Sequence, residues 1–241
     1  MPKVSVIVVG AGAGRRFGGT ESKIFQRIGG APVFLRALEP FASRQDVCQI
    51  LLVISAADIE RVKERFGANL GFMGVVLVEG GATRTASVRN ALAHVIPQAD
   101  LVAVHDAVRP CLAQEWIDAV FAQADKTGAA LLAYPVHGTL KTATPEGLVE
   151  RTLPRATVWE AQTPQVFRKD LLLRAYAGNT EATDDAALVE AVGHPVSIVI
   201  GDPRNIKITT PRDLAVAAAV IGTLPKPKPS RLTHPFDEAQ G

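Results

Sequence analysis

The chain has 241 residues, of which 47% are hydrophobic and 21% are charged, and its formal net charge is +2. This length allows one large domain or a domain with an appendage, and the composition is that of an ordinary globular protein. The small net charge gives no reason to expect a nucleic-acid or membrane partner, and no apolar run approaches the roughly 18–20 residues that cross a bilayer. The N-terminus lacks the pattern of a signal peptide, which predicts a cytoplasmic protein.

Apolar runs alternate with segments of helical period along most of the chain. Strands are expected at residues 3–9, 50–54, 75–78, 101–104, 129–136 and 196–200. Helices are expected at residues 33–43 (with Pro32 as the first residue), 58–66 (closed by Gly67), 87–95, 114–126, 169–176, 185–192 and 212–221. The first strand is a continuous Val/Ile run, which is typical of a strand buried on both faces. The pattern predicts an α/β fold, a three-layer sandwich with a mostly parallel sheet.

This alternation breaks at residues 137–161, where side chains alternate loosely around a Pro-Glu-Gly turn at 145–147. The break predicts a β-hairpin inserted into the α/β body. Because an isolated hairpin is only marginally stable, we expect a second subunit to pack against this arm, which gives a homodimer. Residues 224–241 are rich in Pro and Lys and predict a flexible tail, so residues 1–223 form the folded domain.

The loop after the first strand combines glycines with cations. Glycines at 10, 12 and 14 allow backbone amides to approach a ligand closely, and Arg15, Arg16 and Lys23 add positive charge. The loop matches neither the dinucleotide fingerprint nor the P-loop. A dinucleotide pyrophosphate rests on a helix N-terminus and needs no such cations, whereas a triphosphate with a leaving pyrophosphate does. The loop therefore predicts a site for nucleotide activation.

Further polar residues follow other expected strands, at 80–87, 105–110 and 201–209. Ligands of an open parallel sheet bind at the carboxyl ends of its strands, so these loops should converge. Asp106 is placed to hold Mg²⁺ or its bound waters, because this ion takes few protein ligands and otherwise binds phosphate oxygens; the alternatives are a helix cap or an ion pair with Arg109. Lys207 lies inside an apolar alternation and should meet an anion there. His105 is interpreted as a packing residue.

Two features leave their function open. The polar turns at 163–165 and 183–185 fit either a ligand contact or a plain helix cap. Cys48 and Cys111 lack metal-ligand spacing, and we expect both thiols to be free, with Cys48 buried in a strand.

At these loops the sequence resembles the 2-C-methyl-D-erythritol 4-phosphate cytidylyltransferases. The resemblance is carried by Gly-Ala-Gly-Ala-Gly-Arg-Arg-Phe at 10–17 with Lys23, and by the segments 80–88, 104–111, 139–141, 159–165, 183–185 and 205–209. It covers residues 3–220. It implies a Rossmann-like nucleotidyltransferase domain of the glycosyltransferase-A type with a projecting β-arm that joins a homodimer. The chain departs from the usual family pattern at Gly10, Ala82 and Val108.

The resemblance also implies roles for individual residues. The catalytic cations are Arg16, Lys23 and Lys207. The CTP contacts are Gly10, Ala11, Gly12, Gly81, Ser87 and Asp106. The contacts to the methylerythritol phosphate are Asp106, Arg109, Thr139, Arg155, Thr163 and Thr183, some of them supplied by the arm of the partner subunit. The expected cofactor is Mg²⁺, held mostly through phosphates, with Asp106 as the candidate protein ligand.

The implied reaction suits the residue types. A phosphomonoester oxygen attacks the α-phosphorus of CTP in line, and catalysis consists mainly of positioning and electrostatic stabilisation. The closest alternative is a related enzyme that uses another acceptor, such as ribitol 5-phosphate. Alternatives from other classes are an NAD(P)-dependent dehydrogenase, which would need a third glycine where Arg15 or Phe17 stands, and a non-catalytic nucleotide-binding module.

Overall fold

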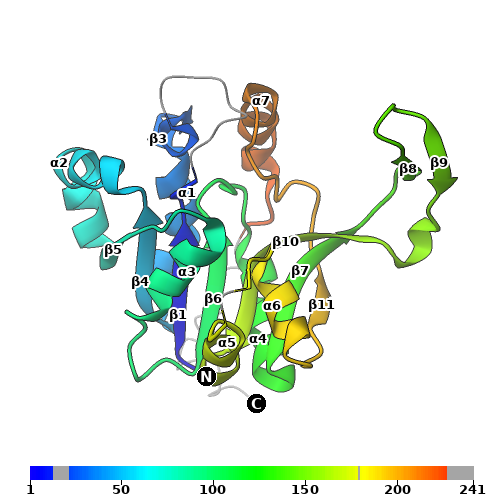
Figure 1. Cartoon of the computed structure of the whole chain (residues 1–241). Coiled ribbons are helices and arrows are strands. Elements are labelled where there is room, and N and C mark those ends of the chain that lie inside the picture. Colours follow the sequence, from blue (N-terminus) through cyan, green and yellow to red (C-terminus); the bar gives the residue numbers. More distant parts are fainter. Residues whose placement is uncertain (13–21, 179, 227–241) are drawn as a thin grey trace, which may run out of the picture.

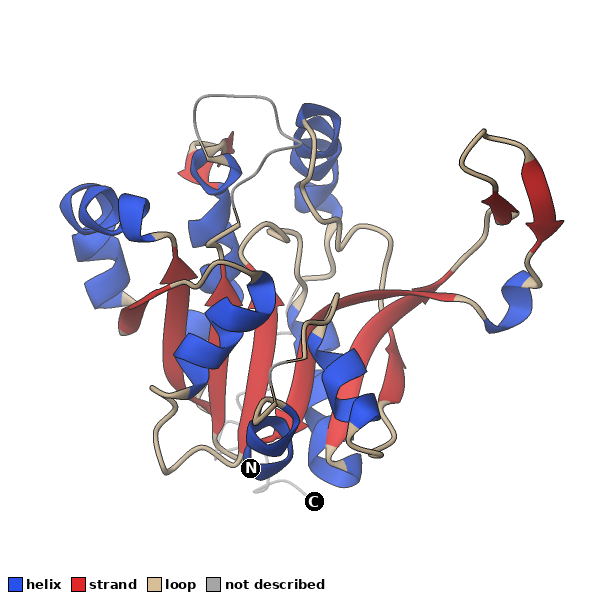
Figure 2. Ribbon diagram, in the orientation of Figure 1, coloured by secondary structure: helices blue, strands red, loops and turns tan. Residues whose placement is uncertain are grey.

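A seven-stranded sheet with the order β11-β7-β10-β6-β1-β4-β5 forms the centre of the fold (Figure 2). The computed structural model describes residues 1–12, 22–178 and 180–226 (Figure 1). The strands are β1 (Val4–Val9), β4 (Val47–Ile54), β5 (Val75–Glu79), β6 (Leu101–Asp106), β7 (Ala129–Pro135), β10 (Trp159–Arg168) and β11 (Ser197–Ile200). All are parallel except β10, which runs antiparallel to both β6 and β7. The predicted mostly parallel sheet is confirmed.

Helices cover both faces of this sheet. On one face the core includes α1 (Val33–Ala42), α2 (Ala56–Phe72), α4 (Gln114–Thr127) and α7 (Pro211–Val220). On the other face it includes α3 (Arg84–Leu92), α5 (Lys169–Ala175) and α6 (Asp185–Ala191). The residues of β1 alternate between these two cores, because successive side chains of a strand point to opposite faces. The fold is therefore the three-layer sandwich that the sequence predicts.

Several short elements lie outside the central sheet and the α-helices. They are the 3-10 helices η2 (Lys23–Phe25), η3 (Arg155–Thr157) and η4 (Ile221–Thr223), and the two-residue strands β2 (Arg27–Ile28) and β3 (Ala31–Pro32), which pair with each other. No helix among the described residues is both long enough and apolar enough to span a bilayer.

Several local predictions were wrong. Pro32 caps α1 and is not its first helical residue, and α2 continues through Gly67 as far as Phe72. The predicted helix at 87–95 begins earlier, at Arg84. Both cysteines are free as expected, but Cys48 is only half-buried. The largest omission is β10, which lies in the middle of the sheet.

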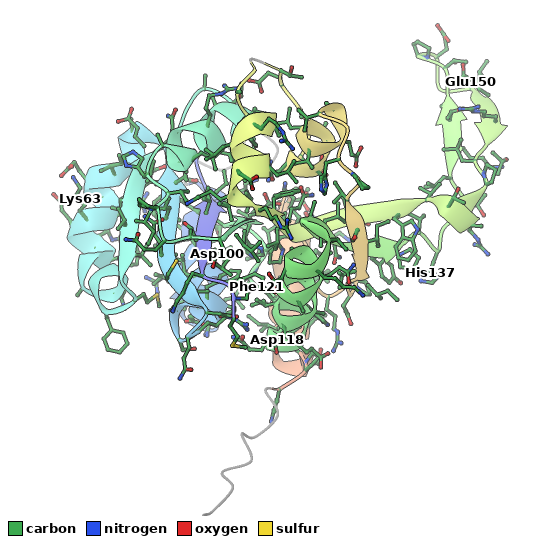
Figure 3. All side chains as sticks on the ribbon, turned by 90° about the horizontal axis from the view of Figure 1, so that it is seen from below. Lys63, Asp100, Asp118, Phe121, His137 and Glu150 are labelled. Carbon is green, nitrogen blue, oxygen red and sulfur yellow. The ribbon has the colours of Figure 1, made fainter. Side chains whose placement is uncertain are left out.

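The predicted hairpin is present and extends away from the sheet (Figure 1). It consists of β8 (Lys141–Ala143) and β9 (Val149–Thr152), paired antiparallel. Gly147 closes the turn with a φ of +86°, a conformation that glycine adopts without strain. Figure 3 shows Glu150 on the far part of this arm and His137 near its base. The division into a 1–223 domain and a 224–241 tail stays a prediction, and residues 227–241 lie outside the described chain.

Candidate active site

A cavity of about 300 Å³ opens at the carboxyl ends of the parallel strands. The loops after β1, β5, β6 and β11 contribute to its wall, as the sequence predicts for an open sheet. Eight predicted site residues line it: Gly10, Ala11, Gly12, Lys23, Gly81, Ser87, Asp106 and Lys207. Ala82 and Val108, where the chain departs from the family pattern, line it as well.

A second cavity, of about 210 Å³, shares part of this wall. Its lining includes the predicted residues Arg109, Thr163 and Thr183. Thr163 reaches this edge because β10 is antiparallel, which places the beginning of β10 beside the end of β6. Arg84, Asp106 and Lys207 line both cavities. The two cavities are therefore joined along one charged wall.

Asp106 is the centre of the charge distribution in this wall. Its Oδ2 lies 2.9 Å from Lys207 Nζ and 3.3 Å from Arg109 Nε, and its Oδ1 lies 3.6 Å from Arg84 Nε. Burial by itself would raise the pKa of Asp106, but the charges of Lys207, Arg84 and Arg109 outweigh burial and hold the pKa well below its usual range. Asp106 is therefore ionised at neutral pH.

This arrangement bears on the predictions for Asp106 and Lys207. Asp106 forms the ion pair with Arg109 that the sequence analysis gave as an alternative to metal binding. Lys207 meets an anion as predicted, and within the described chain that anion is the Asp106 carboxylate. Lys207 does not lie in a strand; it lies in the loop after β11, where the amide of the next residue, Ile208, donates to Val108 O at 2.8 Å.

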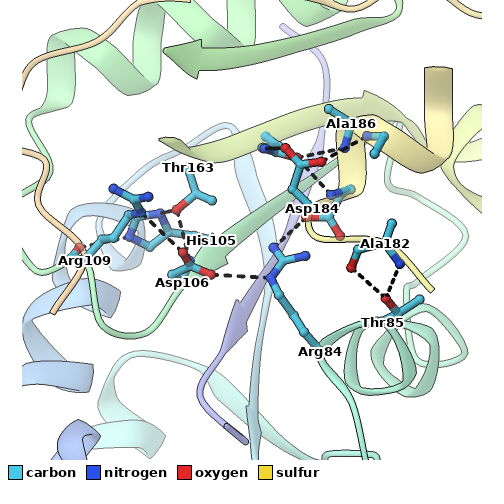
Figure 4. A network of polar contacts seen from close by, with 12 residues as sticks. Arg84, Thr85, His105, Asp106, Arg109, Thr163, Ala182, Asp184 and Ala186 are labelled. Carbon is cyan, nitrogen blue, oxygen red and sulfur yellow. Dashed lines mark hydrogen bonds and ion pairs between the residues drawn. The ribbon is translucent and has the colours of Figure 1, made fainter. Parts of the chain in front are cut away.

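A buried hydrogen-bond network holds the end of β6 in place (Figure 4). The Asp106 amide donates to Thr163 Oγ1 at 3.1 Å, and Thr163 Oγ1 lies 2.9 Å from His105 Nδ1. His105 Nε2 lies 3.1 Å from the carbonyl oxygen of Arg109, which can only accept. The His105 proton is thus on Nε2, and the Thr163 hydroxyl donates to Nδ1. His105 packs and orients its neighbours, as predicted.

The same network predicts how folding stability depends on pH. Burial lowers the pKa of His105 from 6.5 to about 4. Between these values the unfolded chain binds a proton that the folded chain does not, so stability is complete above pH 6.5 and decreases as the pH falls toward 4. The full loss is about 3 kcal/mol, at roughly 1.4 kcal/mol per pKa unit. Denaturant melts of the wild type and His105→Asn across this range measure it, and equal pH slopes in both proteins would contradict it.

Arg84 is the charged residue lining both cavities that the sequence analysis did not predict. It is the first residue of α3, and its Nη2 lies 2.6 Å from Asp185 Oδ2 while its Nε faces Asp106 (Figure 4). Burial opposes its charge, but Asp185 and Asp106 outweigh burial and raise the pKa of Arg84. Its position in the motif at 80–88, which follows an expected strand, could have indicated that it belongs to the site.

Glycine and serine shape the loop that precedes Arg84. A Cβ on Gly81 would lie 2.5 Å from Ala86 Cβ, so a larger residue cannot fit without moving the helix start. The Gly81 amide donates to Ser87 Oγ at 3.0 Å, and Ser87 Oγ donates to Thr83 O at 2.8 Å. Ser87 therefore fixes the turn on which the predicted CTP contacts lie.

Two described residues among those predicted, Thr139 and Arg155, do not line either cavity. Thr139 and Arg155 lie on the exposed arm, and Arg155 donates to the carbonyl oxygen of His137 there. Arg16, predicted to steady the triphosphate, lies outside the described residues.

The described residues contain no group of three or more His, Cys, Asp or Glu side chains that could hold a metal ion. Asp106 is the candidate carboxylate, and three cations surround it. Because these cations already pair with the carboxylate, a Mg²⁺ ion at this site would need phosphate oxygens for most of its ligands, as is usual for this ion. The wall as a whole is suited to binding phosphate groups.

Comparisons with known proteins agree with this geometry. The sequence model of the 2-C-methyl-D-erythritol 4-phosphate cytidylyltransferase family matches residues 4–223. A relative of that name from Rhodopirellula baltica is 44% identical over 231 residues, which cover 90% of this chain and 94% of the relative. Another, from Pelotomaculum thermopropionicum, is 41% identical and covers 92% of this chain and 95% of its own. The crystal structure of the cytidylyltransferase from Thermus thermophilus superposes with a TM-score of 0.76 at 34% identity, over 91% of this chain and 99% of that chain.

Proposed function

The chain belongs to the 2-C-methyl-D-erythritol 4-phosphate cytidylyltransferase family, and we propose that its larger cavity holds CTP while the smaller one holds the acceptor. The enzyme transfers the cytidylyl group of CTP to 2-C-methyl-D-erythritol 4-phosphate and releases pyrophosphate, a step of non-mevalonate isoprenoid biosynthesis. Membership of this family argues against the two alternative functions from other classes, an NAD(P)-dependent dehydrogenase and a non-catalytic nucleotide-binding module. The observation that carries the proposed site is the wall of Arg84, Asp106 and Lys207 common to both cavities.

The cations that line the larger cavity are suited to binding a triphosphate. Lys23 and Lys207, which are distant in the sequence, both line it, and we assign them to the phosphates of CTP. The same role for Arg16, which lies outside the described residues, stays a prediction from the family resemblance. Gly10, Ala11, Gly12, Gly81 and Ser87 line the remainder and are assigned to the base and ribose. The Lys207 side chain is 38% exposed, so its ammonium group can contact a phosphate without leaving Asp106.

The smaller cavity offers donors to a phosphorylated polyol. Arg109 uses two of its donors within the protein, at Asn205 O and Asp106, and a guanidinium has five. Thr183 adds a hydroxyl from the loop before α6. An acceptor phosphate held here faces the α-phosphate of CTP across the wall. Because that phosphate is already ionised at neutral pH, its attack requires no general base, and the residues act by positioning and by charge stabilisation.

The need for Mg²⁺ remains a proposal, which is supported by the fit of a single carboxylate to a phosphate-bound ion. Asp106 is the residue that would hold it, directly or through water. When bound, the ion would neutralise charge on the triphosphate and on the leaving pyrophosphate. The cytoplasmic location stays a prediction.

The β-arm supports a homodimer. Its apolar side chains are left in solvent, since Leu148 is 68% and Val149 is 64% exposed. A two-stranded hairpin is marginally stable by itself, so burial against a second copy would stabilise it. The arm also carries Thr139 and Arg155, which have no place in the site of their own chain. We propose that the arm completes the acceptor cavity of the partner subunit.

The acceptor assignment is tested by measuring pyrophosphate release from CTP with each of two phosphates. We expect turnover with 2-C-methyl-D-erythritol 4-phosphate and a far lower kcat/KM with ribitol 5-phosphate, because the family to which the chain belongs uses the former. Equal or greater kcat/KM with ribitol 5-phosphate would contradict the assignment. Omission of Mg²⁺ in the same assay tests the metal requirement.

A further inference from the structure

We propose that Arg84 is a positioning residue for cytidylyl transfer, which fixes the Asp106 carboxylate at the boundary between the two cavities. This inference rests on the site assignment given above. Arg84 is the first residue of α3 and lines both cavities. Its contacts within the protein indicate that it acts through Asp106.

The guanidinium group of Arg84 is anchored by Asp185. Its Nη2 lies 2.6 Å from Asp185 Oδ2, and Asp185 is fully buried at the start of α6. The other Asp185 oxygen accepts from the Tyr176 hydroxyl at 2.5 Å, and the Asp185 amide donates to Gln165 Oε1 at 3.1 Å. A carboxylate held at both oxygens and at its backbone cannot move freely. Because the planar guanidinium of Arg84 is paired with this carboxylate, its own position is restricted as well.

A second nitrogen of the same guanidinium group, Nε, faces Asp106. Arg84 Nε lies 3.6 Å from Oδ1, whereas Lys207 and Arg109 both contact Oδ2. Among the described residues, Arg84 is therefore the one cation paired with Oδ1. Without it, Oδ1 loses its cation while Oδ2 keeps its two partners, so the carboxylate can turn about its last torsion and shift the Lys207 ammonium group with it. A displacement of about 1 Å in a catalytic group can cost about 10²-fold in rate.

The neighbours of Arg84 show what distinguishes it. Thr83 Oγ1 donates to Glu181 Oε1 at 3.0 Å, and Thr85 Oγ1 contacts the backbone of Ala182 at 3.3 and 3.4 Å. All three successive residues thus attach the start of α3 to the segment that carries Thr183. Arg84 alone among these three also pairs with Asp106. Its side chain therefore links the start of α3 both to the segment at 181–185 and to Asp106.

Removal of Arg84 alone leaves Asp185 as a buried charge without its cation, which can unfold the protein. The test therefore compares D185N with the double variant R84M/D185N, in which that charge is absent. We expect kcat of the double variant to fall about 10–100-fold below that of D185N, with a much smaller change in KM for CTP. R84K/D185N should recover part of kcat, because lysine supplies one charge but not the planar fork.

Arg89→Met is the matched control. Arg89 lies on the same helix and donates to Gly178 O at 2.8 Å, so it attaches α3 to the same region without reaching Asp106. The Arg89→Met variant should have a lower melting temperature but an unchanged kcat. If the double variant keeps the kcat of D185N while Lys207→Ala is inactive, the Arg84 inference is overturned and the site assignment stands. If Lys207→Ala and the double variant both keep full activity, the site assignment has failed as well.

Discussion

We expect Lys207→Ala to lower kcat by about 10²–10³-fold without unfolding the protein. The ammonium group lies at the junction of the two cavities, where charge develops on the phosphoryl oxygens during transfer. Its loss removes a preorganised positive charge that bulk water cannot replace. The fold should survive because Asp106 keeps Arg109 and Arg84 as partners. Steady-state pyrophosphate release and a thermal melt measure the two effects separately.

Lys23→Ala should behave in the same way, since Lys23 lines the larger cavity from the β1 side. Lys169→Ala is a suitable control, because this lysine lies at the start of α5 and donates to Pro97 O, away from both cavities. Near-wild-type turnover in Lys207→Ala would show that Lys207 serves only as a structural partner of Asp106.

Much of the fold could be predicted because long buried strands have simple signals. The β1 sequence is apolar at nearly every position, and both faces of the strand are covered by helices. The extent of α2 could not be predicted, because Gly67 is a common helix terminator. In the structure Phe66 and Leu70 are buried on either side of Gly67, and their packing outweighs the cost of glycine within the helix.

β10 was missed for a physical reason. Its middle reads Gln-Thr-Pro-Gln at 162–165, which is typical of a turn, and proline cannot donate to a central ladder. The structure accommodates Pro164 at a register shift between Ala161 and Gln165, where the pairing with β7 is interrupted. The polar side chains of this stretch are buried and serve the site. The turn propensity of residues 162–165 is therefore outweighed by the contacts that this stretch makes at the site.

The site was predicted in outline because parallel strands end at one edge, so loops distant in sequence must meet there. Its exact pairing was not predictable. Arg84 and Asp185 are 101 residues apart, and nothing in either local sequence specifies the other. The sequence likewise predicts that Lys207 meets an anion without indicating which one, and in the structure Asp106 is that partner.

The carboxylates of the site hold its cations in place. Asp106 pairs with Lys207, Arg84 and Arg109, and Asp185 pairs with Arg84. These cations line the two cavities, so they are positioned for phosphate groups, and little reorganisation is needed during transfer.

The largest effect expected outside this wall is that of Arg155→Ala on the arm. If Arg155 completes the acceptor cavity of the partner subunit, its loss should reduce kcat/KM for the acceptor by about 10²-fold, as for other groups that position a substrate. The variant should still dimerise, since Arg155 is exposed in the single chain and its contact there is to the carbonyl oxygen of His137. Arg151→Ala, on the exposed strand β9, is the matched control and should retain activity.

Hybrid dimers decide which chain Arg155 serves. One chain carries Arg155→Ala, the other carries Lys207→Ala, and two affinity tags allow the hybrid to be purified. If the arm acts across the dimer, one site combines an intact Lys207 with an intact Arg155 from the partner, and the hybrid regains about half of wild-type activity. If Arg155 acts within its own chain, both sites are defective and the hybrid is inactive. An inactive hybrid, or a monomeric wild type by light scattering, would contradict the shared site.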